Sequence, residues 1–182
     1  MVKQNVIDPK GFVRTVNRLS HEIIERNKGA ETIGIVGIRT RGDYLAHRIA
    51  QKISQMENVQ IPIGSLDITL YRDDLRGKLN QPQLKTTDIL YDITNKNIIL
   101  VDDVLFTGRT VRSALNALMD IGRPASVQLA VMVDRGHRQI PIKADFVGKN
   151  IPTSYTQQIQ VMMAEIDSED AVYLYETEGG KE

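Results

Sequence analysis

The sequence predicts an α/β fold in which helices flank a mostly parallel central sheet. Short β-branched runs alternate with amphipathic helical segments along the chain, a pattern typical of such sheets. Residues 32–38, 97–101 and 126–133 are predominantly apolar, as expected for strands that are covered on both faces. No repeat or linker divides the 182 residues, so we expect a single domain over residues 1–182.

Composition narrows the classes of function without choosing one. Hydrophobic residues make up 41% of the chain, and 23 basic residues balance 23 acidic ones. Overall charge gives no reason to expect nucleic acid or an anionic membrane as a partner, although a balanced total can hide a local basic patch. The absence of cysteine excludes disulfides, thiolate metal sites and cysteine nucleophiles. No run approaches the roughly 18 apolar residues of a membrane helix, so we expect a cytoplasmic protein without a membrane partner.

A long helix is predicted near the N-terminus. Asp8 is a suitable N-cap, Pro9 suits the first helical position, and Gly29 suits the stop. Between them, apolar residues recur at helical spacing along one side. The opposite side carries polar and charged residues: Arg14, Arg18, His21 and Glu25.

The remaining elements follow from the same patterns. Further helices are expected over residues 43–56 and 110–121. A polar, partly basic stretch over residues 72–87 has no clear period, and a loop of that length is usually functional or disordered. Strands or β-rich segments are expected over residues 32–38, 61–71, 89–93, 97–101, 126–133, 146–147, 159–164 and 171–175.

The most informative segment is the loop after the strand 97–101. That strand ends at Asp102 and Asp103, and the turn 107–110, Thr-Gly-Arg-Thr, then opens a helix. Sites in open α/β sheets lie at the carboxyl ends of strands. The turn can present backbone N–H groups to a phosphate, and two carboxylates can accept hydrogen bonds from vicinal hydroxyls. A phosphate site and a diol site, one ribose apart, predict a sugar phosphate ligand.

Other classes of protein also place two acids after a buried strand. Receiver domains do so near the start of the chain, whereas this pair lies in the middle. A Walker-type nucleotide site requires G-x-x-x-x-G-K-[ST], which the sequence lacks, as it lacks G-x-G-x-x-G. A loop with only a structural role is the remaining alternative.

Residues 98–110 resemble the phosphoribosyl pyrophosphate signature of type I phosphoribosyltransferases, whose α/β fold carries a small hood. The resemblance implies that Asp102 and Asp103 are catalytic and hold the ribose hydroxyls, while residues 106–110 wrap the 5′-phosphate. It also implies Mg²⁺, bound mainly through the substrate's pyrophosphate and ribose hydroxyls rather than by protein ligands. Substrate contacts are then expected along the loop: Val101, Asp102, Asp103, Val104, Leu105, Phe106, Thr107, Gly108, Arg109 and Thr110.

Two further segments coincide with substrate loops of that family. Thr40 and Arg41 lie in the glycine-bounded loop 37–42, which matches the pyrophosphate loop, and a catalytic Arg41 would neutralise charge on the leaving group. Residues 72–87 resemble the mobile hood, where a catalytic Arg72 would reach over the pyrophosphate as the loop closes and excludes water. Without the resemblance, both segments could equally be described as solvated basic loops.

The choice of base depends on Phe106. In purine-specific members this position usually holds a third acid, which handles a proton on the base. Phenylalanine therefore argues for a pyrimidine, whose ring N–H is already acidic.

The chain is most similar to pyrimidine operon attenuators that also have uracil phosphoribosyltransferase activity. The similarity rests on residues 21–29, 67–75, 133–138 and 148–154. In that group, uracil lies near the segment that matches residues 133–154, with its polar edge met largely by backbone groups. We therefore expect substrate contacts from this segment: Val133, Asp134 and Arg135.

The same similarity implies a second partner. The attenuators bind a hairpin in their own messenger RNA, UMP or UTP promotes that binding, and the proteins form homodimers or homotetramers. Asn17 stands where threonine is expected, although asparagine can also hydrogen-bond RNA. The RNA contacts expected from the resemblance are Arg14, Asn17, Arg18, His21, Arg26 and Lys149.

Two alternatives stay open. One is a base-salvage phosphoribosyltransferase without an RNA target, in which the polar side of the first helix is only solvated. The other is a regulator whose catalytic site survives as a nucleotide sensor.

Overall fold

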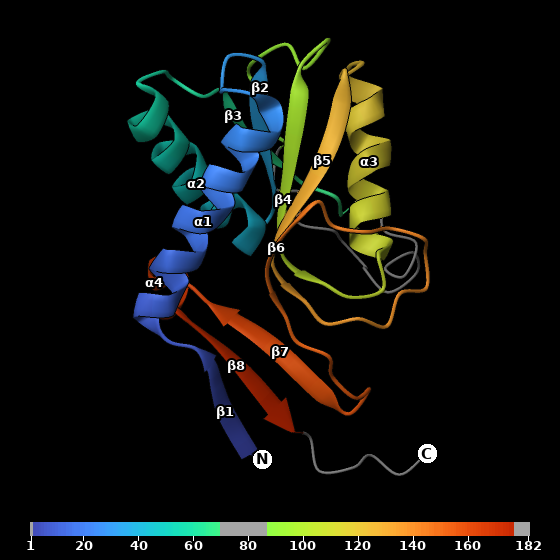
Figure 1. Ribbon diagram of the computed structural model, residues 1–182. Coiled ribbons are helices and arrows are strands. Elements are labelled where there is room, and N and C mark those ends of the chain that lie inside the picture. The colour runs from blue at the N-terminus through green and yellow to red at the C-terminus, as the bar shows by residue number, and fades with distance from the viewer. Residues whose placement is uncertain (1, 70–86, 177–182) are drawn as a thin grey trace.

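The computed structural model describes residues 2–69 and 87–176. Figure 1 shows a twisted sheet with helices on both faces and a smaller sheet beneath it. The elements in chain order are β1 (Val2–Ile7), α1 (Pro9–Asn27), β2 (Ile33–Ile38), α2 (Arg41–Glu57), β3 (Ile63–Leu66), β4 (Asn97–Leu105), α3 (Arg109–Ile121), β5 (Ser126–Asp134), β6 (Phe146–Asn150), β7 (Gln157–Met162), α4 (Ala164–Asp167) and β8 (Ala171–Glu176).

The larger sheet has five parallel strands in the order β3-β2-β4-β5-β6. Helices α1 and α2 cover one face and α3 covers the other (Figure 1). Along β4, Ile99 and Val101 pack on the α1–α2 side, while Ile98 and Leu100 pack on the α3 side. This arrangement confirms the predicted mostly parallel sheet flanked by helices, because strands buried on both faces need a layer on each.

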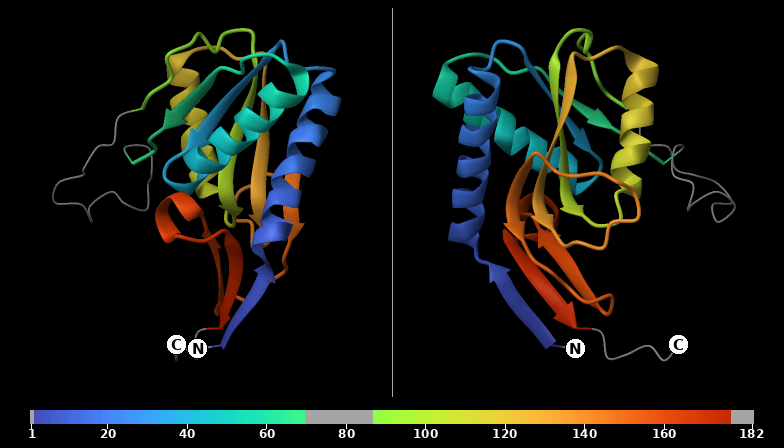
Figure 2. Two further views of the ribbon diagram at one scale, coloured as in Figure 1. Left: turned by 90° about the vertical axis from the view of Figure 1, so that its left-hand side faces the viewer. Right: turned by 45° about the vertical axis from the view of Figure 1, so that its right-hand side comes forward.

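The smaller sheet is antiparallel, in the order β1-β8-β7, and it joins the two ends of the described chain. Figure 2 shows it beyond the carboxyl ends of the main strands. Ile7, Val161 and Val172 from this sheet belong to the same apolar core as α1. Strand β1 was not predicted, because residues 2–7 alternate weakly. The hood predicted over residues 72–87 lies almost wholly outside the described residues, and the single-domain division stays a prediction.

The ends of α1 confirm the predicted signals. The Oδ1 of Asp8 accepts the N–H of Gly11 at 2.7 Å, and Pro9 occupies the first helical position. At the other end, Lys28 and Gly29 have φ values of 56° and 120°, which end the helix in left-handed conformations.

The strand predicted over residues 89–93 is wrong. Only Asp88 forms a bridge, with Ser65, and the chain then turns toward β4. The segment packs through side chains instead: the hydroxyl of Tyr91 donates to the carbonyl of Ile35 at 3.0 Å, and Ile93 is buried. Apolar content that signals a strand therefore serves here to pack against the core on the α3 side of the sheet.

Several boundaries also differ from the prediction. Strand β4 runs to Leu105 rather than ending at residue 101, because it stays paired with β5 beyond the point where β2 leaves it. Helix α2 begins at Arg41 rather than Asp43, so Arg41 and Gly42 belong to its first turn. The predicted strand 159–164 ends at Met162, and the one-turn helix α4 follows. A side chain decides this last boundary, because Asp167 accepts the N–H of Met163 at 2.9 Å and closes the turn.

Candidate active site

Two carboxylates lie near the carboxyl end of the central strand β4, which continues past them to Leu105. Strand β2 pairs with β4 only as far as Val101, so Asp102 and Asp103 lie where the sheet opens. The Oδ1 of Asp102 accepts the N–H of Asp103 at 2.9 Å, and the Oδ1 of Asp103 accepts the N–H of Val104 at 2.8 Å. Burial raises the pKa of Asp103, and the charge of Arg41 opposes that rise. Both carboxylates are therefore held in place by the backbone before a ligand arrives.

The turn after β4 encloses a pocket of about 270 Å³, lined by Asp102 and residues 104–111. Gly108 has a φ of 91°, a conformation that favours glycine, and α3 starts immediately after it. The first turn of α3 thus lines the pocket with backbone N–H groups, the arrangement that binds phosphate. A neighbouring loop supports the turn, since the carbonyl of Thr107 accepts the N–H groups of Gln139 and Ile140 at 3.0 and 3.1 Å.

The predicted pyrophosphate loop lies directly against the end of β4. A Cβ on Gly42 would stand 2.5 Å from the carbonyl oxygen of Val101 and 3.0 Å from the Cα of Asp102. Only glycine permits this approach. Thr40 caps α2 without a side-chain hydrogen bond, and its peptide bond to Arg39 is cis. The structure therefore brings together the two predicted substrate loops, which are far apart in the sequence.

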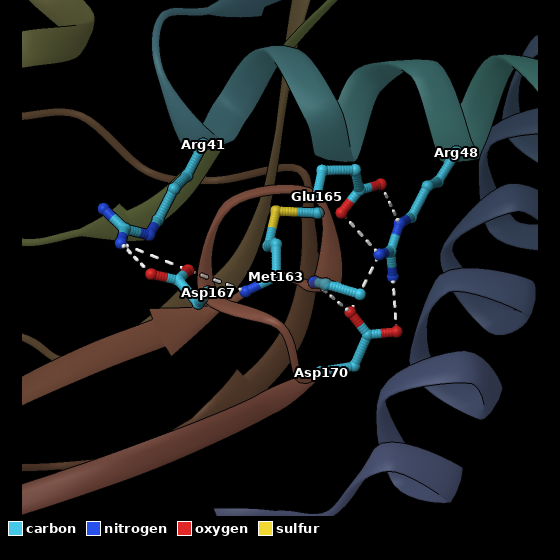
Figure 3. A network of polar contacts seen from close by, with 7 residues as sticks. Arg41, Arg48, Met163, Glu165, Asp167 and Asp170 are labelled. Atoms are coloured by element: carbon cyan, nitrogen blue, oxygen red, sulfur yellow. Dashed lines mark hydrogen bonds and ion pairs between the residues drawn. The ribbon is translucent and has the colours of Figure 1, made fainter.

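Arginine side chains line this meeting point. Within residues 2–69 and 87–176, Arg39 and Arg41 each have a buried Nε–H without a hydrogen-bond acceptor. Buried donors without partners are uncommon, and an anionic ligand would satisfy them. The Nη2 of Arg41 donates to Asp167 at 2.9 Å (Figure 3). Sequence reasoning missed Asp167, because a lone acid near the C-terminus carries no local signal.

The end of β5 lies beside the end of β4 and holds a buried arginine. Arg135 is 8% exposed, and its guanidinium carbon lies 4.1 Å from the centroid of the Phe106 ring. It donates to the hydroxyl of Thr153 at 3.0 Å and to the carbonyl of Gln157 at 2.7 Å. Burial lowers the pKa of Arg135. Its side chain thus joins three loops. Its backbone is engaged as well, since its N–H donates to the carbonyl of Leu105 at 3.1 Å and its carbonyl accepts the hydroxyl of Thr153 at 3.3 Å.

The side chain of Asp134 is also bonded to other groups of the protein. It forms an ion pair with Arg138, which also donates to the carbonyl of Phe106 at 2.7 Å. Desolvation acts to raise the pKa of Asp134, but hydrogen bonds from Arg138 and from the N–H of Gly136 lower it overall. The loop 134–138, with parts of residues 150–153, lines a hollow of about 420 Å³.

The apolar side chains of three predicted substrate contacts are buried: Val101, Leu105 and Val133. Those of Val101 and Val133 belong to the core on the α1–α2 side. Leu105 packs on the α3 side, although it also lines the pocket after β4. For the two valines, the predicted contact can come only from the backbone.

Most of the residues predicted to bind RNA gather around α1 and β6. We call this the α1–β6 surface, and it comprises Arg14, Arg18, His21, Arg26 and Lys149. Arg18 donates to the carbonyls of residues 147 and 148 in β6. Arg26 pairs with Asp145 at 2.8 Å, just before the strand begins. The Nζ of Lys149 donates to the carbonyl of Val6 at 2.8 Å. Two cations of α1 and one of β6 therefore lie on the same surface.

The other three members of the set are all on α1. Arg14 and His21 are exposed on the same side of the helix as Arg18. Asn17 instead lines a groove between α1 and α2, next to Arg48. The structure therefore groups five of the six residues and sets Asn17 apart.

One predicted site residue falls outside what the structure describes. Two other predictions concern a metal held by protein ligands and a membrane helix, neither of which was expected. Arg72 lies outside the described residues. Within residues 2–69 and 87–176, no group of three or more His, Asp or Glu side chains could hold a metal ion. The same residues form no helix that is long and apolar enough to cross a membrane.

Comparison with known proteins connects this geometry to a family. The sequence matches the phosphoribosyl transferase domain over residues 4–166. It is 55% identical over 176 residues to a protein named bifunctional protein PyrR from Bacillus cereus (strain AH820), covering 96% of this chain and 98% of the relative. A protein of the same name from Bacillus mycoides (strain KBAB4) is 54% identical, with the same coverage.

Solved structures agree on the fold. A hypoxanthine-guanine phosphoribosyltransferase from Bacillus anthracis superposes with a TM-score of 0.70 at 19% identity, over 97% of this chain and 99% of that one. The hypoxanthine phosphoribosyltransferase of Trypanosoma cruzi gives 0.69 at 14% identity, over 96% and 97%. Such low identities show the fold alone, and they confirm the predicted type I architecture. The sequence match and the relatives go further: the chain belongs to the phosphoribosyl transferase domain family and, within it, to the PyrR group.

Proposed function

We propose that the chain transfers the phosphoribosyl group of phosphoribosyl pyrophosphate to uracil, giving UMP and pyrophosphate, and that it also regulates pyrimidine genes by binding RNA. One observation carries the enzymatic part: the β4 carboxylates, the Gly108 turn and the start of α2 meet at one edge of the sheet. The 55% identity to a bifunctional PyrR protein supports the choice within the family.

The ribose phosphate would bind along the loop after β4. Asp102 and Asp103 would accept hydrogen bonds from the two ribose hydroxyls, and residues 106–110 would wrap the 5′-phosphate. The backbone bonds that already hold both carboxylates reduce the reorganisation needed when the substrate arrives.

In the reaction, the bond between C1′ and the pyrophosphate oxygen breaks, the bond between C1′ and N1 of uracil forms, and the N1 proton is released. Positive charge develops on the ribose as the leaving group departs. An ionised Asp103 would stabilise that charge, and the nearby charge of Arg41 favours the ionised form against the effect of burial.

The leaving group would bind at the start of α2. The buried Nε–H groups of Arg39 and Arg41, together with the N–H groups of the first helical turn, are donors suited to pyrophosphate. Arg72 would add positive charge from the hood. Mg²⁺ bound to the pyrophosphate and ribose hydroxyls would supply further charge neutralisation. The lack of a three-ligand cluster among residues 2–69 and 87–176 fits a metal held mainly by the substrate.

Uracil would lie between Phe106 and the segment 133–154. Phe106 contacts the side chains of Arg135 and His137, so an apolar ring occupies the place where purine-specific members hold an acid. The side chains of Asp134 and Arg135 and the backbone of Arg135 are engaged with protein groups, so other backbone N–H and carbonyl groups of this segment would recognise the base. A site that satisfies the polar edge of uracil rejects cytosine, because a buried group would stay unpaired.

RNA would bind to the α1–β6 surface, with UMP or UTP favouring the bound state. A short path connects the two sites, since Lys149 pairs in register with Val133 at the end of β5. If nucleotide and RNA both bind one conformation more tightly, each raises the affinity of the other. We further propose a cytoplasmic homodimer or homotetramer, as implied by the family.

The first test is to incubate the protein with Mg²⁺, phosphoribosyl pyrophosphate and each of uracil, cytosine, hypoxanthine and orotate, and to measure pyrophosphate release. We expect release with uracil alone. No release with any base would overturn the enzymatic proposal and favour a nucleotide-sensing regulator. Release with hypoxanthine would overturn the role given to Phe106.

One observation favours a salvage enzyme without an RNA target. Arg18, Arg26 and Lys149 already have partners within the protein, as in a solvated structural surface. Binding of a pyrimidine-operon leader hairpin, measured with and without UMP, separates the two functions. Affinity that UMP raises at least about fivefold supports regulation, which corresponds to a coupling typical of linked sites. Equal, weak binding of hairpin and scrambled RNA supports salvage alone.

A further inference from the structure

A carboxylate from the C-terminal segment contacts the proposed pyrophosphate loop. The Nη2 of Arg41 lies 2.9 Å from Oδ1 and 3.2 Å from Oδ2 of Asp167 (Figure 3). The N–H of Met163 donates to the same Oδ2 at 2.9 Å. The Asp167 side chain is 12% exposed and Arg41 is 31% exposed. Asp167 is thus fixed by its own turn and faces the arginine.

The turn that carries Asp167 is anchored independently of that contact. Arg48, farther along α2, donates to both oxygens of Glu165 at 2.8 and 2.7 Å and to both oxygens of Asp170 at 2.8 Å (Figure 3). The N–H of Ala164 also donates to Asp170 at 2.9 Å. Since these bonds already attach the turn to α2, the Arg41–Asp167 pair is not needed to attach it.

The position of Arg41 links this turn to the reaction site. Gly42, the next residue, approaches the backbone of Val101 and Asp102, and the charge of Arg41 opposes the rise in the pKa of Asp103. Asp167 takes hydrogen bonds from one nitrogen, while the buried Nε–H has no acceptor among the described residues. A guanidinium is a rigid planar fork, so fixing one nitrogen also fixes the direction of the others.

We propose that Asp167 is a positioning residue that orients Arg41 so that its free N–H groups meet the pyrophosphate of the substrate. The inference rests on the proposed function, in which Arg41 binds the leaving group. Burying the charges of Arg41 and Asp167 costs desolvation free energy that their mutual attraction need not repay. Here the pair would hold Arg41 in the orientation that binds the ligand. Asp167 itself does not touch the substrate in this arrangement; it acts through Arg41.

The test compares D167N with E165Q. E165Q is the matched control, because it removes one acid from the same turn while Asp170 still holds Arg48. Calorimetric titration with pyrophosphate and Mg²⁺ measures binding without turnover, and steady-state kinetics give KM separately for phosphoribosyl pyrophosphate and uracil. We expect D167N to weaken pyrophosphate binding and raise the KM for phosphoribosyl pyrophosphate by about tenfold, as for loss of a charge-assisted contact. The KM for uracil and all E165Q values should stay within about twofold.

A second arm tests whether the effect passes through Arg41. In an R41A background, D167N should cause no further loss of pyrophosphate affinity, because the group it orients is gone. Unchanged or tighter pyrophosphate binding by D167N overturns the inference, as does an equal loss in the R41A background. If D167N does not fold, R41K carries the test, since lysine cannot span Asp167 and the ligand; wild-type affinity in R41K contradicts the proposal.

The two proposals fail in different ways. If the wild-type protein releases pyrophosphate with no base, the proposed function is wrong, whatever D167N does. If the wild-type protein is active with uracil and D167N matches it, only the role of Asp167 is wrong.

Discussion

The carboxyl end of β4 and the α1–β6 surface both concentrate charge, but they hold it differently. At β4, Asp102 is 7% exposed, and the backbone fixes both carboxylates beside a helix that glycine brings into contact. On the α1–β6 surface, the side chains of Arg18 and Arg26 are 47% and 51% exposed, and each has an ion-pair partner. Function at β4 should depend on the exact placement of a few groups, whereas binding on the α1–β6 surface should depend on the summed charge of several cations.

The two regions differ in how far water reaches their charged groups. Charges in a poorly hydrated pocket interact strongly with a developing charge, while exposed charges are screened within about 10 Å by salt at 0.1 M. Single substitutions should therefore abolish function at β4 but only reduce binding on the α1–β6 surface.

The largest effect is expected for D103N. In the proposed mechanism Asp103 faces the positive charge that develops on the ribose, so its loss should lower kcat/KM by about 100-fold or more. The thermal midpoint at pH 7 should stay equal or rise. Burial raises the folded-state pKa of Asp103 above its unfolded value, so the ionised acid opposes folding once the pH exceeds that unfolded value of about 4.

Turnover and Tm of D103N should be measured against E31Q, which changes an exposed acid at the opposite end of β2. The Tm difference between wild type and D103N should shrink as the pH falls to about 3, where Asp103 is protonated in both states. Wild-type turnover in D103N would refute the ribose role.

G42A tests the contact between the two loops. The added Cβ would lie 2.5 Å from the carbonyl of Val101, so the first turn of α2 must shift. We expect kcat/KM to fall by about tenfold through misplacement of the pyrophosphate site, and stability to fall by about 1–3 kcal/mol through overpacking. Q51A, at an exposed position of α2, is the control for kinetics and urea unfolding. Full activity in G42A would show that the close approach is dispensable.

R18A tests whether the α1–β6 surface works by summed charge. Removing one cation should weaken hairpin binding by about three- to tenfold at 0.1 M salt and reduce the slope of log K against log salt by about 1. Pyrophosphate release should stay within about twofold of wild type, because the site at β4 is untouched. A drop of several orders of magnitude in RNA affinity, or an unchanged salt slope, would contradict a surface of additive contacts.

The smallest effect concerns stability and pH at the α2–α4 contact. Desolvation acts to raise the pKa of Asp170, but the hydrogen bond and charge of Arg48 lower it overall. A lowered folded-state pKa stabilises the fold above the unfolded value of about 3.9, and that stability is lost as the pH falls through the folded-state pKa. D170N should cost about 1 kcal/mol at pH 7, after screening, and progressively less below about pH 4. Chemical unfolding at several pH values, beside E165Q, measures this; a pH-independent loss would assign the effect to packing.

The sequence by itself determined the parts that depend on neighbours along the chain. The cap at Asp8, the apolar core strands and the loop from Asp102 to Thr110 follow from local patterns. Local hydrogen bonding explains this success, since each carboxylate at the end of β4 is held by the next residue's own N–H. The family resemblance then identified phosphoribosyl pyrophosphate as the expected substrate of this loop.

Only the tertiary structure decided which distant residues meet. Gly42 stands out only because another strand passes 2.5 Å from its missing Cβ, and Asp167 only because its turn is bound to α2. The terminal strands β1 and β8 likewise pair across the whole length of the chain. Such contacts leave no periodicity or motif in the sequence, because the partner that gives each residue its role is set by the packing of the sheet and not by the residues beside it.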